Sequence, residues 1–458
     1  MQLREWQKDC LQRIKTGISN LQTQFTVVAS TGSGKTILQA LFAKHLIDEG
    51  LVDYILNLVP TDTLRSSNAR VFASSVGIDL RTARPDTGDL KHGFISTYQM
   101  ISRRSNLDAL LTALTKDGKK FAVIADEVHH GSYHEESKYG DALSYLIGKS
   151  TFTLTVSGTL WRSDKHMITG VNYELQDDEF VAKPDFEYSL EQATHDGVVV
   201  PVYFSELDGS VEYQIEDMTT NETNNESIVS TKGATDKRAT VAYKHLVNPD
   251  GEFCKELLRQ AASELTVKLR KHDTLTPDSL PPAGLVVASS KNHADKIALL
   301  LEDITGEEPL VVHGGRPNNK EMIRQFTDGT LPNKWLVSVG MVSEGVDIPR
   351  IKVLAYLTSA RTELVFHQII GRSMRARVQP SGEPLSEYAS IFMPSTPRLH
   401  EYVSNFIVRE PKFAIKSIEK VSVEETELVD RIKPLRIIRQ ELISSAVIGV
   451  QQFLNGVE

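Results

Sequence analysis

The sequence predicts an α/β protein with two parallel-sheet domains in tandem. Short runs rich in Val, Ile and Thr read as nearly continuous apolar strands, which is typical of strands covered on both faces in a parallel sheet. Helical stretches separate these runs, and a polar segment divides them into two groups, which indicates two domains. At 458 residues the chain is also too long for a single hydrophobic core.

Eight strands are expected, four in each domain. The first group comprises QFTVVAS (24–30), YILNLVP (54–60), FAVIAD (121–126) and TFTLTVSG (151–158). The second group comprises GLVVASS (284–290), PLVVHGG (309–315), KWLVSVG (334–340) and VLAYLTS (353–359). Because helical sequence separates the runs within each group, the strands of each domain are expected to be joined by crossover helices.

Two segments outside these groups complete the predicted organisation. The stretch 209–237 is rich in Asn, Thr, Glu and Asp, which predicts a surface loop. The strand signal fades after about residue 397, and the apolar positions of 428–454 predict a helix that packs on the second domain. The predicted divisions are 1–195, 196–400 with an acidic polar loop near 205–237, and 401–458 as a short, mostly helical tail.

Composition and charge narrow the class of protein. The fractions of 40% hydrophobic and 24% charged residues are typical of a soluble globular protein. The sequence shows no apolar run long enough to span a bilayer and no signal-peptide core, so we expect no membrane partner and a cytoplasmic location. The net charge is −9, but 351–380 carries five Lys or Arg and one Glu. This local excess of positive charge keeps a nucleic-acid partner open.

The two cysteines carry no predicted chemistry. Cys10 and Cys254 lie far apart in the sequence and form no CxxC pair, which argues against a thiolate zinc site and a disulfide framework. We expect both to be buried or incidental thiols.

A glycine-rich loop, ASTGSGKT (29–36), lies between the first predicted strand and a predicted helix. The glycines let backbone N–H groups point inward, Lys35 can reach the β- and γ-phosphates, and the Thr36 hydroxyl can bind Mg²⁺. The strict pattern has Gly where this chain has Ala29, and a glycine-rich turn without nucleotide is the alternative. The strand and helix on either side favour a nucleotide site. Its predicted residues are Thr31, Gly32, Ser33, Gly34, Lys35 and Thr36.

A cluster of acids and histidines, ADEVHHGSYHEES (125–137), follows the third predicted strand. That strand delivers Asp126 and Glu127 to the carboxyl edge of the sheet, where open α/β sheets bind ligands. Asp126 is predicted to hold Mg²⁺ through water, and Glu127 to act as the general base that polarises the attacking water.

A zinc site is the competing interpretation of this cluster, because His130 and His134 are four residues apart. The intervening Gly-Ser-Tyr is a poor helix interior, however, and the Glu of an HExxH pattern is misplaced. The remaining residues are therefore expected to be solvated loop residues: His130, His134, Glu135 and Glu136.

In order and spacing, the motifs resemble those of the superfamily 2 helicases and translocases. The matching segments are LREWQ (3–7), VPT (59–61), STYQ (96–99), DEVH (126–129), SGT (157–159), VGMVSEGVDIP (339–349) and HQIIGRSMR (367–375). The resemblance covers residues 3–377 and implies two RecA-like domains with ATP in the cleft between them. It also implies ATP and Mg²⁺ as cofactors and a nucleic-acid-dependent ATPase activity.

Roles for individual residues follow from this resemblance alone. Gln7 would read the adenine edge, and Gly345 and Asp347 would contribute to nucleotide binding. Arg372 and Arg375 would be arginine fingers that stabilise charge on the γ-phosphate. The residues implied to couple hydrolysis to domain movement are His129, Ser157, Thr159 and Gln368, and those implied to contact nucleic acid are Thr61, Thr97, Ser289 and Ser338.

The resemblance also bears on the polymer. The segment YSLEQATHDGVVVPVYF (188–204) is similar to the hinge of bacterial and phage DNA motors related to restriction-enzyme translocating subunits and branch-migration helicases, so DNA is favoured over RNA. The alternatives are an RNA helicase, an ATP-gated nucleic-acid-binding subunit of a larger complex and, more distantly, a metal-dependent hydrolase. The tail after residue 400 is a candidate surface for a protein partner.

Overall fold

The structure is a computed structural model that forms two compact units, the first running to Asp196 and the second beginning at Gly197. It describes residues 3–82, 90–130, 138–158, 160, 167–176, 179–217, 223–228, 230–231, 242–339, 348–358, 362–379, 381, 384–407, 414–416 and 432–449. No helix within these ranges is long and apolar enough to cross a membrane.

The first unit is built on a sheet of six parallel strands. In spatial order these are β3 (Gly93–Thr97), β2 (Tyr54–Val59), β4 (Phe121–Asp126), β5 (Phe152–Ser157), β1 (Gln24–Ala29) and β8 (Phe186–Tyr188). Every residue of β3, β4 and β5 is buried, as their unbroken apolar sequences predict. The four strands expected in this part of the chain are all present.

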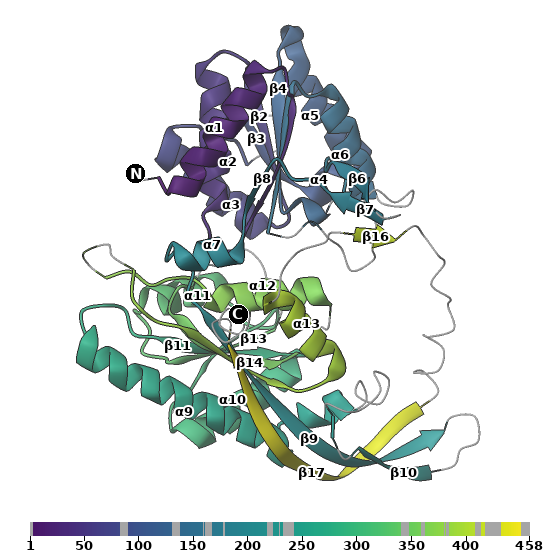
Figure 1. Cartoon of the computed structure of the whole chain (residues 1–458), viewed down its shortest axis with the longest axis vertical. Coiled ribbons are helices and arrows are strands. Elements are labelled where there is room, and N and C mark those ends of the chain that lie inside the picture. Colours follow the sequence, from purple (N-terminus) through teal and green to yellow (C-terminus); the bar gives the residue numbers. More distant parts are fainter. Residues whose placement is uncertain are drawn as a thin grey trace. The chain divides into compact units, whose positions relative to one another are not determined.

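Helices cover both faces of this sheet (Figure 1). One face carries α1 (Glu5–Ser19), α2 (Lys35–Asp48) and α3 (Asp62–Val76), and the other carries α4 (Tyr98–Ile101), α5 (Arg104–Thr115) and α6 (Lys138–Lys149). The hydrophobic core beside α4, α5 and α6 contains buried side chains such as Phe94, Leu107, Val123 and Leu143. Short turns η1 (Lys116–Gly118) and η2 (Val128–His130) flank β4, and α7 (Leu190–His195) follows β8.

A small antiparallel sheet is attached to the first unit. It consists of β6 (Tyr173–Gln176), β7 (Glu179–Ala182) and β16 (Ala414–Lys416), with β7 in the middle. A short strand from the C-terminal part of the chain therefore belongs to the first unit.

The second unit contains an eight-stranded sheet. In spatial order the strands are β10 (Thr223–Ile228), β9 (Val202–Asp217), β15 (Ala389–Pro394), β14 (Ile351–Leu357), β11 (Ala283–Ala288), β13 (Trp335–Ser338) and β12 (Leu310–Val312), and β17 (Ile432–Gly449) also pairs with β9. The strands from β9 to β12 are parallel, whereas β10 and β17 are antiparallel to β9.

Helices also cover both faces of the second sheet (Figure 1). One face carries α9 (Glu252–Leu275) and α10 (Lys291–Thr305), and the other carries α11 (Asn319–Asp328), α12 (Glu363–Ser373) and α13 (Pro397–Ile407). The strands β11, β12, β13 and β14 are buried throughout. The second unit therefore also has parallel strands covered by helices on both faces, which confirms the predicted tandem α/β fold.

The structure corrects the prediction for the described residues of 205–237. The segment was expected to be a polar loop, but Val202–Asp217 forms β9 and Thr223–Ile228 forms β10. The reason lies in the alternation of Val211, Tyr213 and Ile215 with polar residues, a period of two that suits a strand. Acidic composition concealed that alternation.

The predicted helix over 428–454 is also wrong. Residues Ile432–Gly449 form β17, which pairs antiparallel with β9 from Ile432 opposite Asp217 to Gly449 opposite Tyr203. The segment contains five Ile and one Val, whose branched β-carbons favour extended backbone, and pairing with β9 outweighs its helical spacing. Only Pro397–Ile407 in this part of the chain is helical in the described residues.

Candidate nucleotide site

The phosphate loop has the backbone geometry that an anion site requires. Strand β1 ends at Ala29, α2 begins at Lys35, and Gly32 and Gly34 adopt φ angles of 85° and 94°. These angles lie in the left-handed region, which glycine adopts without strain. A β-carbon at Gly34 would also lie 2.9 Å from Nε2 of Gln7. The predicted strand, loop and helix are present, and Lys35 and Thr36 open the helix.

The N-terminal segment holds this loop from one side. Nε2 of Gln7 donates to the Gly34 carbonyl at 3.0 Å, and its Oε1 accepts from the Arg4 backbone N–H at 3.0 Å. Nε1 of Trp6 donates to the Ser33 carbonyl at 3.2 Å, and the Arg4 guanidinium donates to the same carbonyl. Gln7 is therefore buried, and it contacts the phosphate loop of the predicted nucleotide site.

Arg4 and Trp6 were missed by the sequence reasoning. Both flank Gln7 in the segment LREWQ, so their proximity to a predicted site residue was the available signal. The Trp6 ring stacks on Tyr188 with ring centroids 4.9 Å apart, and the Tyr188 hydroxyl donates to Asp196 at 2.8 Å. The aromatic pair ties the segment that contacts the loop to strand β8, next to β1 in the sheet.

Asp126 is the last residue of β4, and amide groups hold its carboxylate. Nε2 of Gln39 donates to Oδ1 at 2.7 Å, and Nδ2 of Asn68 donates to Oδ2 at 3.2 Å. The Tyr98 hydroxyl donates to the Asp126 carbonyl at 2.9 Å. These donors come from α2, α3 and α4, so three helices fix one acid.

Glu127 follows with an uncommon backbone conformation. Its φ angle of 46° lies in the left-handed region, which for a non-glycine residue costs about 1–3 kcal/mol and is concentrated at functional sites. One oxygen of its carboxylate, Oε1, lies 3.0 Å from Nζ of Lys35. Lys35 also donates to the Ala29 carbonyl at 3.3 Å. The backbone turn thus brings the second acid of the pair to the phosphate-loop lysine.

The other carboxylate oxygen of Glu127 contacts the end of β5. The Ser157 hydroxyl donates to Oε2 at 3.1 Å, and the Gly158 backbone N–H donates at 3.3 Å. Nδ1 of His129 lies 2.9 Å from the Ser157 hydroxyl and 3.6 Å from Oε2. Two predicted coupling residues, His129 and Ser157, are therefore brought together with the predicted general base.

The two acids have opposite pKa shifts. Burial, followed by the negative charge of Glu127, raises the pKa of Asp126. Burial also acts to raise the pKa of Glu127, but the ammonium of Lys35 and the ring of His129 outweigh it, and the net shift is downward. Glu127 is accordingly the ionised member that pairs with Lys35.

The donor set fits Mg²⁺ with a nucleotide. Magnesium prefers oxygen ligands, and the Asp126 carboxylate and the Thr36 hydroxyl both belong to the carboxyl edge of the first sheet. The hydroxyls of Ser30 and Ser33 are buried in the phosphate loop without a hydrogen-bond partner among the described residues, as expected where phosphate oxygens would be bound. Within the described ranges, no group of three or more His, Cys, Asp or Glu side chains could hold a metal ion.

Two predicted nucleic-acid contacts lie on the same edge of the first sheet. Thr61 follows β2 and caps α3 by accepting from the Leu64 N–H at 3.3 Å. Thr97 ends β3 and caps α4 by accepting from the Met100 N–H at 3.2 Å. Both hydroxyls therefore have a local structural role as helix caps.

Two predicted residues of the second unit, Ser289 and Ser338, lie at the carboxyl ends of the neighbouring strands β11 and β13. The Ser289 hydroxyl donates to the Leu357 carbonyl at 2.9 Å, and Ser338 is buried at the end of β13. Arg372 is buried in the last turn of α12, and Gln368 of the same helix is half-buried. The Arg375 carbonyl accepts from Nζ of Lys352 at 2.7 Å.

Several predicted residues lie outside the described residues. They are Thr159, Gly345 and Asp347 of the predicted motor site, and His134, Glu135 and Glu136 of the competing zinc interpretation.

Two family models match the chain. The model described as "Type III restriction enzyme, res subunit" matches residues 1–162, and the "Helicase conserved C-terminal domain" model matches residues 273–377. An uncharacterized protein of Mycobacterium tuberculosis is 33% identical over 411 residues, which cover 88% of this chain. The chain spans 63% of that protein's length.

Solved structures share the fold. A fragment assigned to the HsdR subunit of a type I restriction enzyme from Vibrio vulnificus matches with a TM-score of 0.56 at 15% identity, covering 88% of this chain and 66% of that one. The ATP-dependent Type ISP restriction-modification enzyme LlaBIII, bound to DNA, matches with a TM-score of 0.54 at 13% identity, covering 89% and 30%. The two sheets are RecA-like, as in these structures. The two family models, with the shared fold, support a helicase or translocase of superfamily 2.

Proposed function

We propose that this protein is an ATP-dependent motor that moves along nucleic acid, with DNA favoured over RNA. The observation that carries the proposal is the set of contacts joining Lys35 of the phosphate loop, Glu127 after β4 and Ser157 at the end of β5. A bound triphosphate, its attacking water and a movable element would need these three groups side by side.

The ion pair between Lys35 and Glu127 supports an ordered mechanism. The γ-phosphate of ATP competes for the Lys35 ammonium, because phosphate is the stronger anionic partner at a helix N-terminus. Loss of Lys35 from Glu127 removes the main influence that lowers the Glu127 pKa, which makes the carboxylate a better base for the attacking water. ATP itself therefore prepares the general base.

Other residues of the site have separate roles in this proposal. Asp126 and Thr36 hold Mg²⁺, and the amides of Gln39 and Asn68 orient Asp126. Arg372 and Arg375 stabilise the charge that grows on the γ-phosphate. Hydrolysis changes the contacts of Glu127 with Ser157 and His129, which transmits the nucleotide state to the end of β5.

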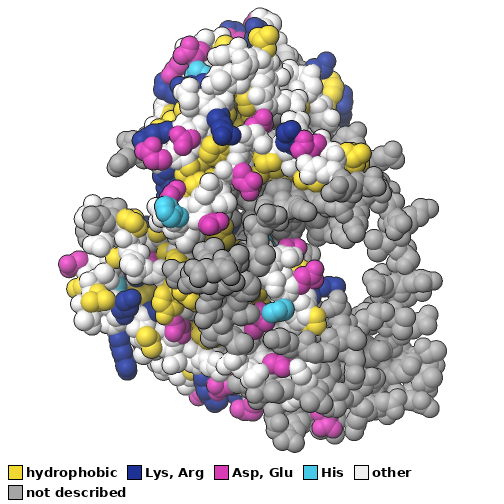
Figure 2. All heavy atoms as spheres, viewed as in Figure 1, with side chains coloured by type: hydrophobic (Ala, Val, Ile, Leu, Met, Phe, Trp, Pro, Cys, Tyr) yellow, Lys and Arg dark blue, Asp and Glu magenta, His cyan; other side chains and the backbone are white. Residues whose placement is uncertain are grey.

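Contacts with the polymer are proposed to be mainly to its backbone. On the face shown in Figure 2, Lys and Arg side chains are interspersed with Asp and Glu rather than gathered into one basic patch. Hydroxyls and backbone amides at the carboxyl edges of the sheets, including those of Thr61 and Thr97, suit sequence-independent phosphate contacts. DNA is favoured because the family model and the neighbours come from restriction enzymes, one of them bound to DNA.

The direct test is the ATPase rate of the purified chain alone and with single-stranded DNA, duplex DNA, forked DNA or RNA. The proposal expects ATP turnover that at least one DNA form stimulates by about tenfold or more. Stimulation by RNA alone would replace the DNA assignment with an RNA helicase. Nucleic-acid binding without turnover would indicate an ATP-gated binding subunit, and turnover that no polymer stimulates would contradict the motor.

A further inference from the structure

The second unit contains a cavity of about 440 Å³ that the proposed motor does not use. It lies between the C-terminal half of α9 and the chain that leads into β15. This volume falls within the range of small-molecule sites in proteins, about 300–1,000 Å³. All of its lining residues belong to one unit.

One face of α9 supplies basic side chains to this cavity. Lys268, Lys271, His272 and Leu275 follow the helical spacing that places residues on one side, and all four line the cavity. The Lys268 ammonium donates to the Tyr388 carbonyl at 2.9 Å and lies 3.2 Å from a carboxylate oxygen of Glu264. Lys271 is exposed and lies one helical turn further on. This face of α9 therefore carries one half-buried ammonium group, of Lys268, and one exposed ammonium group, of Lys271.

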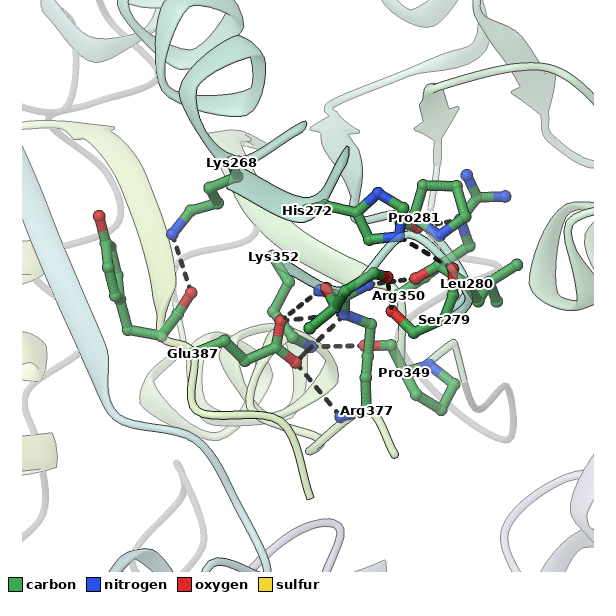
Figure 3. Close-up of polar contacts among 12 residues, drawn as sticks. Lys268, His272, Ser279, Leu280, Pro281, Pro349, Arg350, Lys352, Arg377 and Glu387 are labelled. Carbon is green, nitrogen blue, oxygen red and sulfur yellow. Dashed lines mark hydrogen bonds and ion pairs between the residues drawn. The ribbon is translucent and has the colours of Figure 1, made fainter. Parts of the chain in front are cut away.

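A buried ion cluster forms the opposite wall (Figure 3). The Arg377 guanidinium donates to both oxygens of Glu387, through Nε at 2.9 Å and 3.2 Å and through Nη2 at 2.8 Å. Nζ of Lys352 lies 3.6 Å from the same carboxylate, and the Lys352 side chain is 1% exposed. Arg377 and Glu387 thus form a buried ion pair.

The cations of this region exceed its carboxylates. Arg350 lies beside the cluster, is 2% exposed and donates to the carbonyls of Pro281 at 3.2 Å and of Phe326 at 2.9 Å. The basic side chains are Lys268, Lys271, Arg350, Lys352 and Arg377, and the acids that pair with them are Glu264 and Glu387. Three of these cations, of Lys268, Lys271 and Arg377, line the cavity together with one of the acids, Glu387. This excess of positive charge in a partly enclosed cavity attracts an anion more strongly than exposed lysines in water would.

The pKa values of the Lys268 and Lys352 ammonium groups are lowered, as expected for buried amines near other positive charges. Burial, opposed by nearby carboxylates, lowers the pKa of Lys268 and of Lys352 to about 8, and Arg377 adds to the lowering at Lys352. An anion in the cavity would offset both the burial and the repulsion.

The lining also contains large apolar side chains. Val267 is 54% exposed, Leu275 64% and Tyr388 36%, so three large apolar side chains of the described surface meet at this cavity. Apolar side chains that gather beside fixed polar groups are typical of a site for an organic ligand. A bare inorganic ion would leave these three residues uncovered.

We propose that this cavity binds a small organic phosphate, with the phosphate between Lys268, Lys271 and Arg377 and an aromatic or aliphatic body against Val267, Leu275 and Tyr388. A phosphate dianion suits this excess of positive charge better than a carboxylate does, because it has twice the charge and more acceptor oxygens. The site is separate from the phosphate loop and does not depend on the ATPase.

Titration of the full chain with phenyl phosphate, followed by calorimetry and by the ³¹P signal of the ligand, tests this site. Saturable binding is expected in the wild type and equally in Lys35→Ala, whose change lies in the phosphate loop. Benzoate and inorganic phosphate are expected to bind at least about tenfold more weakly, because the first has one negative charge fewer and the second has no apolar body. Binding that is lost in Lys35→Ala would place the ligand in the phosphate loop and overturn the proposal.

A matched pair of variants locates the ligand. Lys271→Glu is expected to weaken phenyl phosphate binding by about tenfold or more, since an attraction becomes a repulsion at the wall of the cavity. Arg270→Glu makes the same kind of change at an exposed neighbouring position of α9 that does not line the cavity, and it should alter the affinity less than about twofold. Equal loss in both variants, or loss in neither, would contradict the site, as would absence of binding in the wild type.

Discussion

The Lys35 ammonium lies 3.0 Å from a carboxylate oxygen of Glu127. The backbone of Glu127 is in the left-handed conformation, which directs its side chain toward Lys35. The pair joins the first turn of α2 to the turn after β4, so the groups expected to bind phosphate and to activate water are already in contact. In the proposed mechanism ATP replaces Glu127 as the partner of Lys35. In that mechanism Glu127, the general base, stays paired with Lys35 until ATP binds.

Trp6 is expected to support nucleotide affinity without affecting the chemical step. Trp6→Phe removes the N–H that donates to Ser33 but keeps a ring that can stack on Tyr188. The phosphate loop loses one anchor, so the dissociation constant for ATP should rise about threefold to tenfold, the effect of one hydrogen bond, at nearly unchanged kcat. Nucleotide titration and steady-state kinetics measure the two quantities. A fall in kcat at unchanged affinity would contradict this role.

Gln39 is expected to act on magnesium through Asp126. Gln39→Met keeps the volume but removes the donor to Asp126 and the acceptor for Asn57, both buried. The Mg²⁺ concentration for half-maximal ATPase should rise about tenfold or more, as for other partners of metal-binding carboxylates. The chain should also lose about 1–3 kcal/mol of stability. Gln12→Met, the same change at an exposed position of α1, is the control and should change neither quantity.

His129 is expected to couple the nucleotide to the polymer. His129→Ala removes the contact with Ser157 but leaves Lys35, Asp126 and Glu127 in place. The ATPase rate without nucleic acid should stay within about threefold, whereas stimulation by DNA should fall at least about tenfold, a coupling loss of about 1.4 kcal/mol or more. His195→Ala, which alters an exposed histidine on α7, serves as the control. Equal loss of the basal and stimulated rates would assign His129 to the chemistry instead.

The lowered pKa of Lys352 predicts that the free energy of unfolding depends on pH. Burial is the main cause that lowers its pKa to about 8, whereas an unfolded lysine titrates near about 10.4. Between these values the unfolded chain binds more protons than the folded one, so the contribution of Lys352 to the free energy of unfolding rises with pH. The stability of the wild type relative to Lys352→Met should therefore increase by about 2 kcal/mol from pH 8 to pH 10. Denaturant titrations at pH 7, 8, 9 and 10 measure it, and a constant or falling difference would contradict the shift.

The sequence predicted the structure best where an apolar strand pattern ends at a recognisable motif. The strands around the phosphate loop and the acid pair were predictable because unbroken apolar runs end directly at Ala29 and Asp126. The burial of both cysteines was also expected and is confirmed. Local sequence carries these features, since each depends on neighbours along the chain.

Features that depend on distant parts of the chain were not predictable. Strand β17 forms because β9 has an edge to pair with, and no local pattern in 432–449 records that edge. The amides of Gln39 and Asn68 reach Asp126 from two helices that are distant from it in the sequence. Polar residues inside helices look the same in sequence whether they face water or a buried acid.

A comparison of Glu127→Gln with the wild type, for ATP binding and for DNA-stimulated ATP turnover, tests directly whether Glu127 is the general base. The variant should bind ATP with an affinity equal to or higher than that of the wild type, because Lys35 is released from a charged partner. Its stimulated turnover should fall by about 1,000-fold or more, since the base is lost. Turnover within about tenfold of the wild type, or loss of ATP binding, would contradict the assignment of Glu127 as the general base.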